Sequence, residues 1–91
     1  MEEITLKMRN RLRIASTAVD TEIVDNINTA KLDLKRIGLS SASIDLGDEL
    51  VFTACELYCK YMFNFEGEGE SYLLRYQKFR DALSMSGGYY E

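Results

Sequence analysis

The chain has 91 residues, a hydrophobic content of 46% and a net charge of −4, and it contains neither proline nor histidine. This length predicts one domain spanning residues 1–91, and the composition is that of a folded globular chain rather than a disordered one. The negative charge argues against nucleic-acid binding by overall electrostatics, and the lack of histidine excludes histidine-based acid–base catalysis and the common zinc sites. The absence of proline and the abundance of helix formers favour an all-α fold.

The first predicted element is a short helix from Glu2 to Ile14, with acidic residues at its start, where they suit the helix dipole. Four of the eleven cations of the chain fall within it: Lys7, Arg9, Arg11 and Arg13. One interpretation is a basic patch that contacts phosphate or an acidic partner. The other, which we favour, is a solvated amphipathic helix, because no aromatic residue is interleaved and helical spacing scatters the cations around the axis.

A second helix is predicted to run to about Ile37, with Ser16, Thr17 or Asp20 available to cap its start. Its core face is expected to consist of Val19, Ile23, Ile27, Ala30, Leu34 and Ile37. Gly38 follows directly and predicts the helix stop. Leu32 points to the opposite face, where a single exposed leucine is usually without consequence and an oligomer contact is the second interpretation.

The stretch from Leu50 to Phe65 is the most apolar part of the chain and predicts a central buried helix over about residues 48–65. Its broader apolar face is expected to consist of Leu50, Val51, Ala54, Leu57, Tyr58, Tyr61, Met62 and Phe65. A second apolar strip beside it consists of Phe52, Cys55, Cys59 and Phe63. Leu57 and Tyr61 are placed at the middle of the broader face, so truncating either to alanine is expected to destabilise the fold. Some of the surface of this helix is available to another subunit.

Two polar breaks flank the central helix. Residues 39–47 are Ser-rich and predict a loop, and residues 64–70 contain two glycines and three acids, which predicts a flexible acidic turn. The last helix should span roughly Glu70 to Leu83, with Tyr72, Tyr76, Phe79 and Leu83 on one face. Leu74 is expected to point outward. The segment from Ser84 to Glu91 is glycine-linked and predicts a flexible C-terminal tail. The overall expectation is a small bundle of about four helices.

No arrangement of residues indicates an enzyme, a cofactor or a metal site. Cys55 and Cys59 lie four residues apart in the middle of the apolar helix, without a cationic neighbour, and are expected to be buried and unreactive. No Gly-rich phosphate loop is present, because the GEGE run is acidic and would repel phosphate rather than bind it. No apolar run is long enough to cross a bilayer and the N-terminus lacks a signal peptide core, so no membrane partner and a reducing cytosol are expected.

Four segments in this order carry a resemblance to a known family: LKMRNRLRI, VDTEIVDNINTAKLDLKRIGL, DELVFTACELYCKYMFNF and SYLLRYQKFRDALSMSGGYY. The chain resembles, from Leu6 to Tyr90, the small head–tail connector (head-completion adaptor) family of long-tailed double-stranded-DNA bacteriophages. The resemblance implies a structural protein of virion assembly and DNA packaging, found at the head–tail interface of the virion and in the host cytoplasm during assembly.

The same resemblance implies the partners. The chain would form a homo-oligomeric ring, about dodecameric on the portal protein, that extends the DNA channel and joins the filled head to the next head-completion or tail protein. Double-stranded DNA would only pass through the channel, and free subunits could be monomeric. Candidate subunit contacts are Leu32 and Leu74, and candidate portal or neighbour docking residues are Tyr89 and Tyr90. The alternative function is a small helical DNA-binding or regulatory protein that uses the basic segment from Lys7 to Arg13.

Overall fold

A computed structural model describes residues 2–85 of the chain. The described residues form four α-helices and two short 3₁₀ turns, and none of them forms a strand. The elements in chain order are α1 (Glu2–Leu12), η1 (Thr17–Val19), α2 (Asp20–Arg36), α3 (Glu49–Met62), η2 (Phe65–Gly67) and α4 (Gly69–Ser84). The predicted all-α bundle of about four helices is therefore confirmed. The predicted docking residues Tyr89 and Tyr90 lie outside the described residues.

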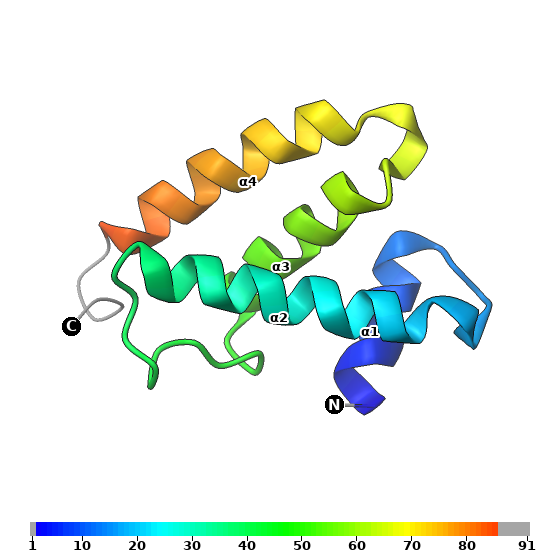
Figure 1. The fold of residues 1–91 in the computed structure, drawn as a ribbon, viewed down its shortest axis with the longest axis horizontal. Coiled ribbons are helices and arrows are strands. Elements are labelled where there is room, and N and C mark those ends of the chain that lie inside the picture. Colours follow the sequence, from blue (N-terminus) through cyan, green and yellow to red (C-terminus); the bar gives the residue numbers. More distant parts are fainter. Residues whose placement is uncertain (1, 86–91) are drawn as a thin grey trace.

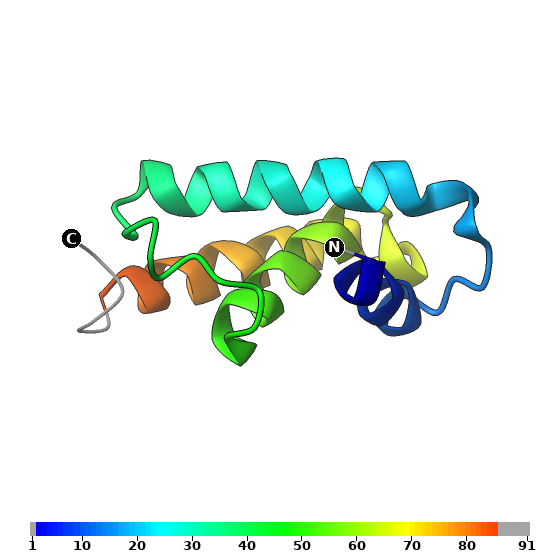
Figure 2. The ribbon, with the colours of Figure 1, turned by 90° about the horizontal axis from the view of Figure 1, so that it is seen from below.

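The helices are arranged in two layers, and α3 has the central position. Figure 1 shows α3 and α4 running antiparallel beside each other, with α2 crossing α3 and the short α1 at the opposite end of the molecule from the end of α4. Seen from below, α2 forms one layer, and α1, α3 and α4 form the other (Figure 2). Helix α3 packs most extensively against α4 and α2 and also contacts α1. The helix predicted to be central therefore holds that position.

The core consists of two hydrophobic clusters that meet at α3. The first joins α1, α2 and α3 and contains the buried residues Met8, Leu12, Ile23, Ile27, Ala30, Phe52, Cys55 and Cys59. The second joins α2, α3 and α4 and contains Leu34, Leu39, Val51, Ala54, Tyr76 and Leu83. Because α3 contributes to both clusters, its burial couples α1 to α4, which lie far apart in the sequence.

The buried face of α3 differs from the predicted one. Leu50 and Met62, both assigned to the core, are 45% and 49% exposed. Leu57 and Tyr61, placed at the middle of the face, are only half-buried, whereas Phe52 is completely buried. The helix is apolar around most of its girth, so its sequence alone could not select which arc faces the partners. Helices α1 and α2 select the arc that carries Phe52.

Local sequence signals explain where the helices begin and end. Helix α3 begins after Asp48, whose carboxylate accepts hydrogen bonds from the backbone N–H groups of Leu50 and Val51 at 2.8 and 3.3 Å. Helix α2 ends as predicted before Gly38, which has φ +109°. The N–H of Gly38 donates to the carbonyl of Lys35, and the following N–H donates to the carbonyl five residues before it, which closes a Schellman motif.

Helix α1 ends two residues earlier than predicted, at Leu12 rather than Ile14. Arg13 adopts φ +58°, a left-handed conformation that is uncommon for a residue with a side chain. The N–H of Ile14 then donates to the carbonyl of Arg9 at 3.0 Å, which closes the helix with the same type of motif that glycine provides at the end of α2. The sequence carried no glycine to signal this stop.

The turn between α3 and α4 is tight. Asn64 has φ +49°, and its side-chain oxygen accepts a hydrogen bond from the N–H of Gly69 at 2.9 Å. A Cβ atom at Gly69 would lie 2.8 Å from that oxygen, so only glycine allows this approach. This contact fixes the start of α4 at Gly69 and directs it back along α3.

Replacing Phe52 with alanine should lower the free energy of unfolding by about 3–5 kcal/mol, because its ring is fully buried in the cluster that α3 forms with α1 and α2. Leu50→Ala, two residues away on the same helix, should cost less than about 1 kcal/mol because that side chain is half exposed. Urea unfolding followed by circular dichroism measures both. Equal losses in the two variants would show that the buried arc of α3 has been misplaced.

Candidate interaction surfaces

Leu32 and Leu74 are exposed, as the sequence predicts. Their exposed fractions are 68% and 58%. Each lies two residues before a buried residue of the same helix, Leu34 on α2 and Tyr76 on α4, which places it about 200° around the helix from the core. Leu6, Leu50, Met62 and Met85 are also exposed, although the sequence analysis placed Leu50 and Met62 in the core.

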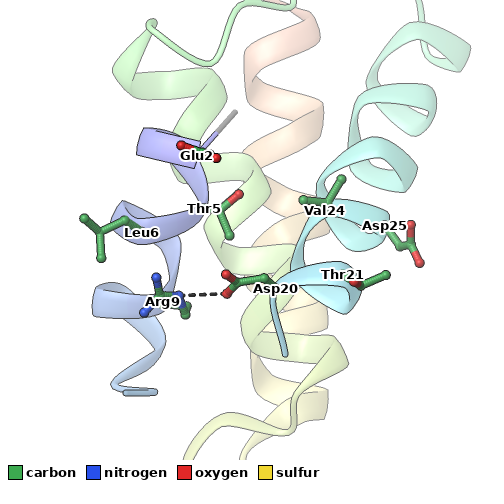
Figure 3. Close-up of a pocket in the computed structure, with 8 residues that line it drawn as sticks. All are labelled: Glu2, Thr5, Leu6, Arg9, Asp20, Thr21, Val24 and Asp25. Atoms are coloured by element: carbon green, nitrogen blue, oxygen red, sulfur yellow. Dashed lines mark ion pairs between the residues drawn. The ribbon is translucent and has the colours of Figure 1, made fainter. Parts of the chain in front are cut away.

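A groove lies between α1 and α2 and has a volume of about 590 Å³. It is lined by Glu2, Thr5, Leu6, Arg9, Asp20, Thr21, Val24 and Asp25. Figure 3 shows Leu6 on the α1 rim and Asp25 on the α2 rim of this α1–α2 groove, with Thr5 and Val24 between them. The groove is open to solvent and combines an apolar floor with acidic residues.

One end of the α1–α2 groove is held by an ion pair. The Nε atom of Arg9 lies 2.7 Å from Oδ1 of Asp20 (Figure 3), and the Arg9 side chain is 15% exposed. The two atoms are close, but their alignment does not satisfy hydrogen-bond geometry, so the attraction between them is mainly electrostatic. The pair joins the last turn of α1 to the start of α2 and keeps the groove walls in register.

A second hollow lies on the other half of α2, with a volume of about 410 Å³. It is lined by Asn28, Lys31, Leu32, Lys35, Ser41 and Ile44. We call it the Leu32 hollow, because that leucine is its most exposed apolar residue. A smaller hollow of about 140 Å³ lies between Leu50 of α3 and the last turns of α4. Three of the exposed apolar residues line these hollows: Leu6, Leu32 and Leu50.

The four cations of the predicted basic patch are all paired with acids from other elements. Lys7 lies 3.3 Å from Glu49, and its ammonium group also lies 4.1 Å from the centre of the Phe52 ring. The Nη1 atom of Arg11 lies 3.4 Å from a carboxylate oxygen of Glu56. The other two pairs are Arg9 with Asp20 at 2.7 Å and Arg13 with Glu66 at 3.7 Å.

These ion pairs indicate a structural function for the basic segment. Each cation contacts a different acid, and those acids belong to α2, α3 and η2, so the segment fastens α1 to the rest of the domain. The acids lie far from the cations in the sequence, which is why sequence reasoning could not foresee the pairing. Of these four acids, Glu56 also contacts a second cation, Lys60, at 3.0 Å one turn along α3.

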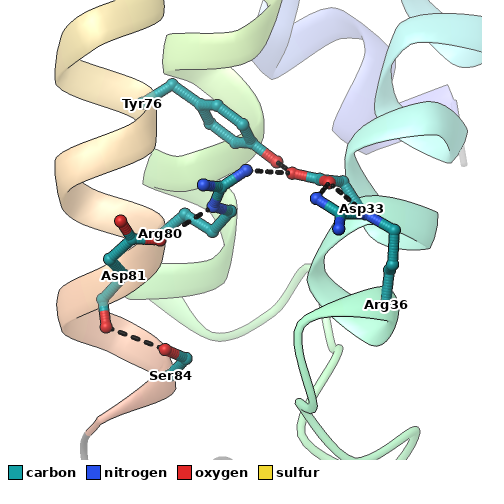
Figure 4. Close-up of polar contacts among 6 residues, drawn as sticks. All are labelled: Asp33, Arg36, Tyr76, Arg80, Asp81 and Ser84. Atoms are coloured by element: carbon teal, nitrogen blue, oxygen red, sulfur yellow. Dashed lines mark hydrogen bonds and ion pairs between the residues drawn. The ribbon is translucent and has the colours of Figure 1, made fainter.

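Asp33 on α2 is the centre of a polar cluster that reaches α4 (Figure 4). Its Oδ2 atom accepts a hydrogen bond from the hydroxyl of Tyr76 at 2.6 Å and one from Arg80 at 3.0 Å. Its Oδ1 atom accepts two from the guanidinium of Arg36 at 2.7 and 3.1 Å. The cluster therefore ties the C-terminal half of α2 directly to α4.

The surroundings of Asp33 stabilise its charged form. Partial burial alone would raise its pKa, but the hydrogen bonds from Tyr76, Arg36 and Arg80 and the charge of Arg80 outweigh that effect and lower it. Burial and the hydrogen bond to the Asp33 carboxylate together raise the pKa of Tyr76, so its hydroxyl remains a donor throughout the physiological range. Sequence reasoning placed Tyr76 in the core but missed this cluster, because the helical pattern does not show which polar groups face one another.

Cys55 and Cys59 are completely buried, as predicted. Burial raises the pKa of each thiol to about 12, so the reactive thiolate is scarce at neutral pH. The charge of Lys31 acts weakly in the opposite direction on Cys55. The two side chains serve as small apolar groups in the cluster between α1, α2 and α3.

Within residues 2–85 no group of three or more histidine, cysteine, aspartate or glutamate side chains is arranged to hold a metal ion. Among the same residues, no helix has the length and apolar character that a membrane span requires. Comparison of the chain with protein-family models, curated proteins and solved structures finds no match.

Asp33→Asn should lower the free energy of unfolding at pH 7 by about 1–3 kcal/mol, because it removes the charged acceptor of the cluster. The folded-state pKa of Asp33 lies below its ordinary value of 3.8, so its stabilisation is fully present above that value. The stabilisation is lost as the pH falls through the lower folded-state pKa. Urea unfolding of parent and variant at a series of pH values should therefore give a difference that is constant near neutrality and shrinks in acid. A difference that persists unchanged in acid would contradict this role.

The thiols of the folded protein should react with an aromatic disulfide reagent at about pH 8 only as fast as the protein unfolds, because both are buried and protonated. Cys55→Ser and Cys59→Ser should each lower the free energy of unfolding by about 1–3 kcal/mol through the buried hydroxyl, and the alanine variants should lower it less. Absorbance-monitored labelling with and without urea measures the reaction. Rapid labelling of the native protein would show that these cysteines are accessible.

Proposed function

We propose that the chain is a structural head–tail connector of a long-tailed double-stranded-DNA bacteriophage. In this function it forms a ring beneath the portal of the filled head, extends the DNA channel and presents a surface to the next head-completion or tail protein. The proposal rests on the resemblance of the segments from Leu6 to Tyr90 and on the exposed surfaces of the domain. The work would be done by shape and protein contacts rather than by a catalytic group.

The observation that carries the proposal is the exposure of Leu32 and Leu74 on different outer faces of so small a domain. Each points away from the core, one from α2 and the other from α4, and these helices lie in different layers (Figure 2). A closed ring joins two different patches head to tail, so every subunit must carry both halves of the contact. Two separate apolar positions on opposite layers meet that requirement.

The ion pairs of the basic segment support a protein that DNA passes without being bound tightly. All four cations from Lys7 to Arg13 are engaged by carboxylates, and the chain has a net charge of −4. A DNA-binding protein gains affinity from free cations that replace counterions on phosphate. A channel through which DNA slides should lack such tight contacts, so the pairing favours the connector over the DNA-binding alternative.

The gene that encodes this chain should lie beside genes for a portal and a capsid protein, and the chain should bind the portal complex encoded there. Negative-stain electron microscopy should then show an added ring at one end of the portal. Leu32→Lys and Leu74→Lys should each reduce ring formation at least tenfold by placing a charge in a subunit contact. Both should leave the free energy of unfolding within about 0.5 kcal/mol of the parent, because the side chains are exposed.

Met62→Lys provides the matched control, because it also introduces a charge at a half-exposed apolar position but lies at the end of α3, outside the proposed contacts. It should form rings as the parent does. The proposal would be contradicted by a genome without a neighbouring portal gene, or by a chain that does not bind that portal. Removal of residues 84–91 tests separately whether the tail that carries Tyr89 and Tyr90 is needed for attachment.

A further inference from the structure

The Leu32 hollow combines an apolar patch with two lysines whose charges are not used inside the domain. Leu32 and Ile44 supply the apolar surface, and Lys31 and Lys35 line the same hollow. Neither lysine takes part in an ion pair within residues 2–85. A segment that carries both large apolar side chains and a negative charge is therefore complementary to this hollow.

Residues 86–91 of the same chain have this chemistry. They read SGGYYE, with two tyrosines followed by a glutamate, and we call them the SGGYYE segment. A tyrosine buries a large ring and still offers a hydroxyl for hydrogen bonding, and Asn28 and Ser41 of the Leu32 hollow carry polar groups that can pair with it. The glutamate is opposite in charge to the two lysines of the hollow.

The end of α4 brings the SGGYYE segment within reach of the Leu32 hollow. Arg80 lies 3.0 Å from the carboxylate of Asp33, which is the residue after Leu32. The end of α4 lies beside the end of α2 (Figure 1), and Met85 follows Arg80 by five residues, or about 8 Å of helix. Six extended residues span about 20 Å, whereas a helix is about 10 Å across, so the segment is long enough to pass around the end of α2.

The other hollows are less suited to this segment. The α1–α2 groove carries the carboxylates of Glu2 and Asp25, which would repel a glutamate (Figure 3). It also lies beside α1, at the opposite end of the molecule from the end of α4 (Figure 1). The hollow between α3 and the last turns of α4 has a volume of about 140 Å³, and no cation is among the described residues that line it.

We propose that the SGGYYE segment binds in the Leu32 hollow of its own chain, with its tyrosine rings against Leu32 and Ile44 and its carboxylate beside Lys31 and Lys35. The bound segment covers Leu32 and thereby blocks the lateral contact that the proposed ring makes through this residue. A portal or a neighbouring subunit that binds the tyrosines uncovers Leu32 and permits the ring to grow. This consequence rests on the proposed function; the contact within the chain does not.

Amide spectra from nuclear magnetic resonance test the contact on the full chain and on a variant that ends at Met85. Truncation should move the signals of Leu32, Ser41 and Ile44 and leave those of α1 in place, because only the hollow loses its occupant. The spectrum of the full chain should be the same from roughly 20 µM to 1 mM, because a contact within one chain does not depend on concentration.

Charge reversal tests which residues hold the segment. Each variant is compared with its own form that ends at Met85, so that direct effects of the substitution cancel. Truncation of Lys31→Glu/Lys35→Glu should move the Ser41 signal at least threefold less than truncation of the parent, because repulsion has already released the segment. Adding Glu91→Lys restores opposite charges and should recover the shift. The control is Lys78→Glu, at an exposed position of α4, which should keep the full shift.

A disulfide tests the geometry independently. Lys35→Cys/Glu91→Cys should close a bond within one chain on mild oxidation, measured as the loss of two free thiols without a gain in mass on non-reducing electrophoresis. The buried Cys55 and Cys59 do not compete for this reaction. Lys78→Cys/Glu91→Cys is the matched control and should close at least tenfold more slowly.

The outcomes separate this contact from the proposed function. Truncation that moves no signal of the hollow, or a cysteine pair that closes no faster than its control, would overturn the contact. Signals that change with concentration, or a disulfide between two chains, would assign the segment to a neighbouring subunit and also overturn it. Each of these results leaves the connector standing, because the connector depends on portal binding. A chain that shows the contact but binds no portal would support the contact and contradict the connector.

Discussion

Helix α3 is apolar around most of its circumference, and the need to cover it is the constraint on which the rest of the structure depends. Helices α1 and α2 cover the arc that carries Phe52, Cys55 and Cys59, and α2 and α4 cover the arc that carries Val51 and Ala54. Within residues 2–85 no further helix covers the outer surfaces of α2 and α4. The exposed leucines are therefore a consequence of how the core is covered.

Ion pairs and hydrogen bonds add to the apolar contacts that hold α1 and α4 against the rest of the domain. Helix α1 is short, and four ion pairs from Lys7 to Arg13 fasten it to α2, α3 and η2. At the other end of the molecule, the Asp33 cluster joins α2 to α4, and Tyr76 contributes both its ring to the core and its hydroxyl to the cluster. Of the seven charged residues of α2, three take part in these ion pairs (Asp20, Asp33 and Arg36), and the other four take part in none within residues 2–85.

Sequence reasoning was accurate where neighbouring residues decide the structure. Periodicity located the helices, Gly38 located the end of α2, and the two-residue offset from Leu34 and Tyr76 located the exposed leucines. It failed where distant residues decide. The buried arc of α3 was set by α1 and α2 rather than by its own pattern. The acids that neutralise the basic segment come from other elements. Arg13 ends α1 in a left-handed conformation that an arginine in the sequence does not predict.

The exposure of Leu32 and Leu74 bears on how the proposed connector would assemble. A single exposed leucine buries little apolar area, so a lateral contact built around it would be weak between free subunits. In the proposed connector, a portal would hold several subunits side by side, and each one that binds would raise the effective concentration of lateral contacts for the next. Under that proposal, weak lateral contacts would favour ring formation on the portal over ring formation in free solution.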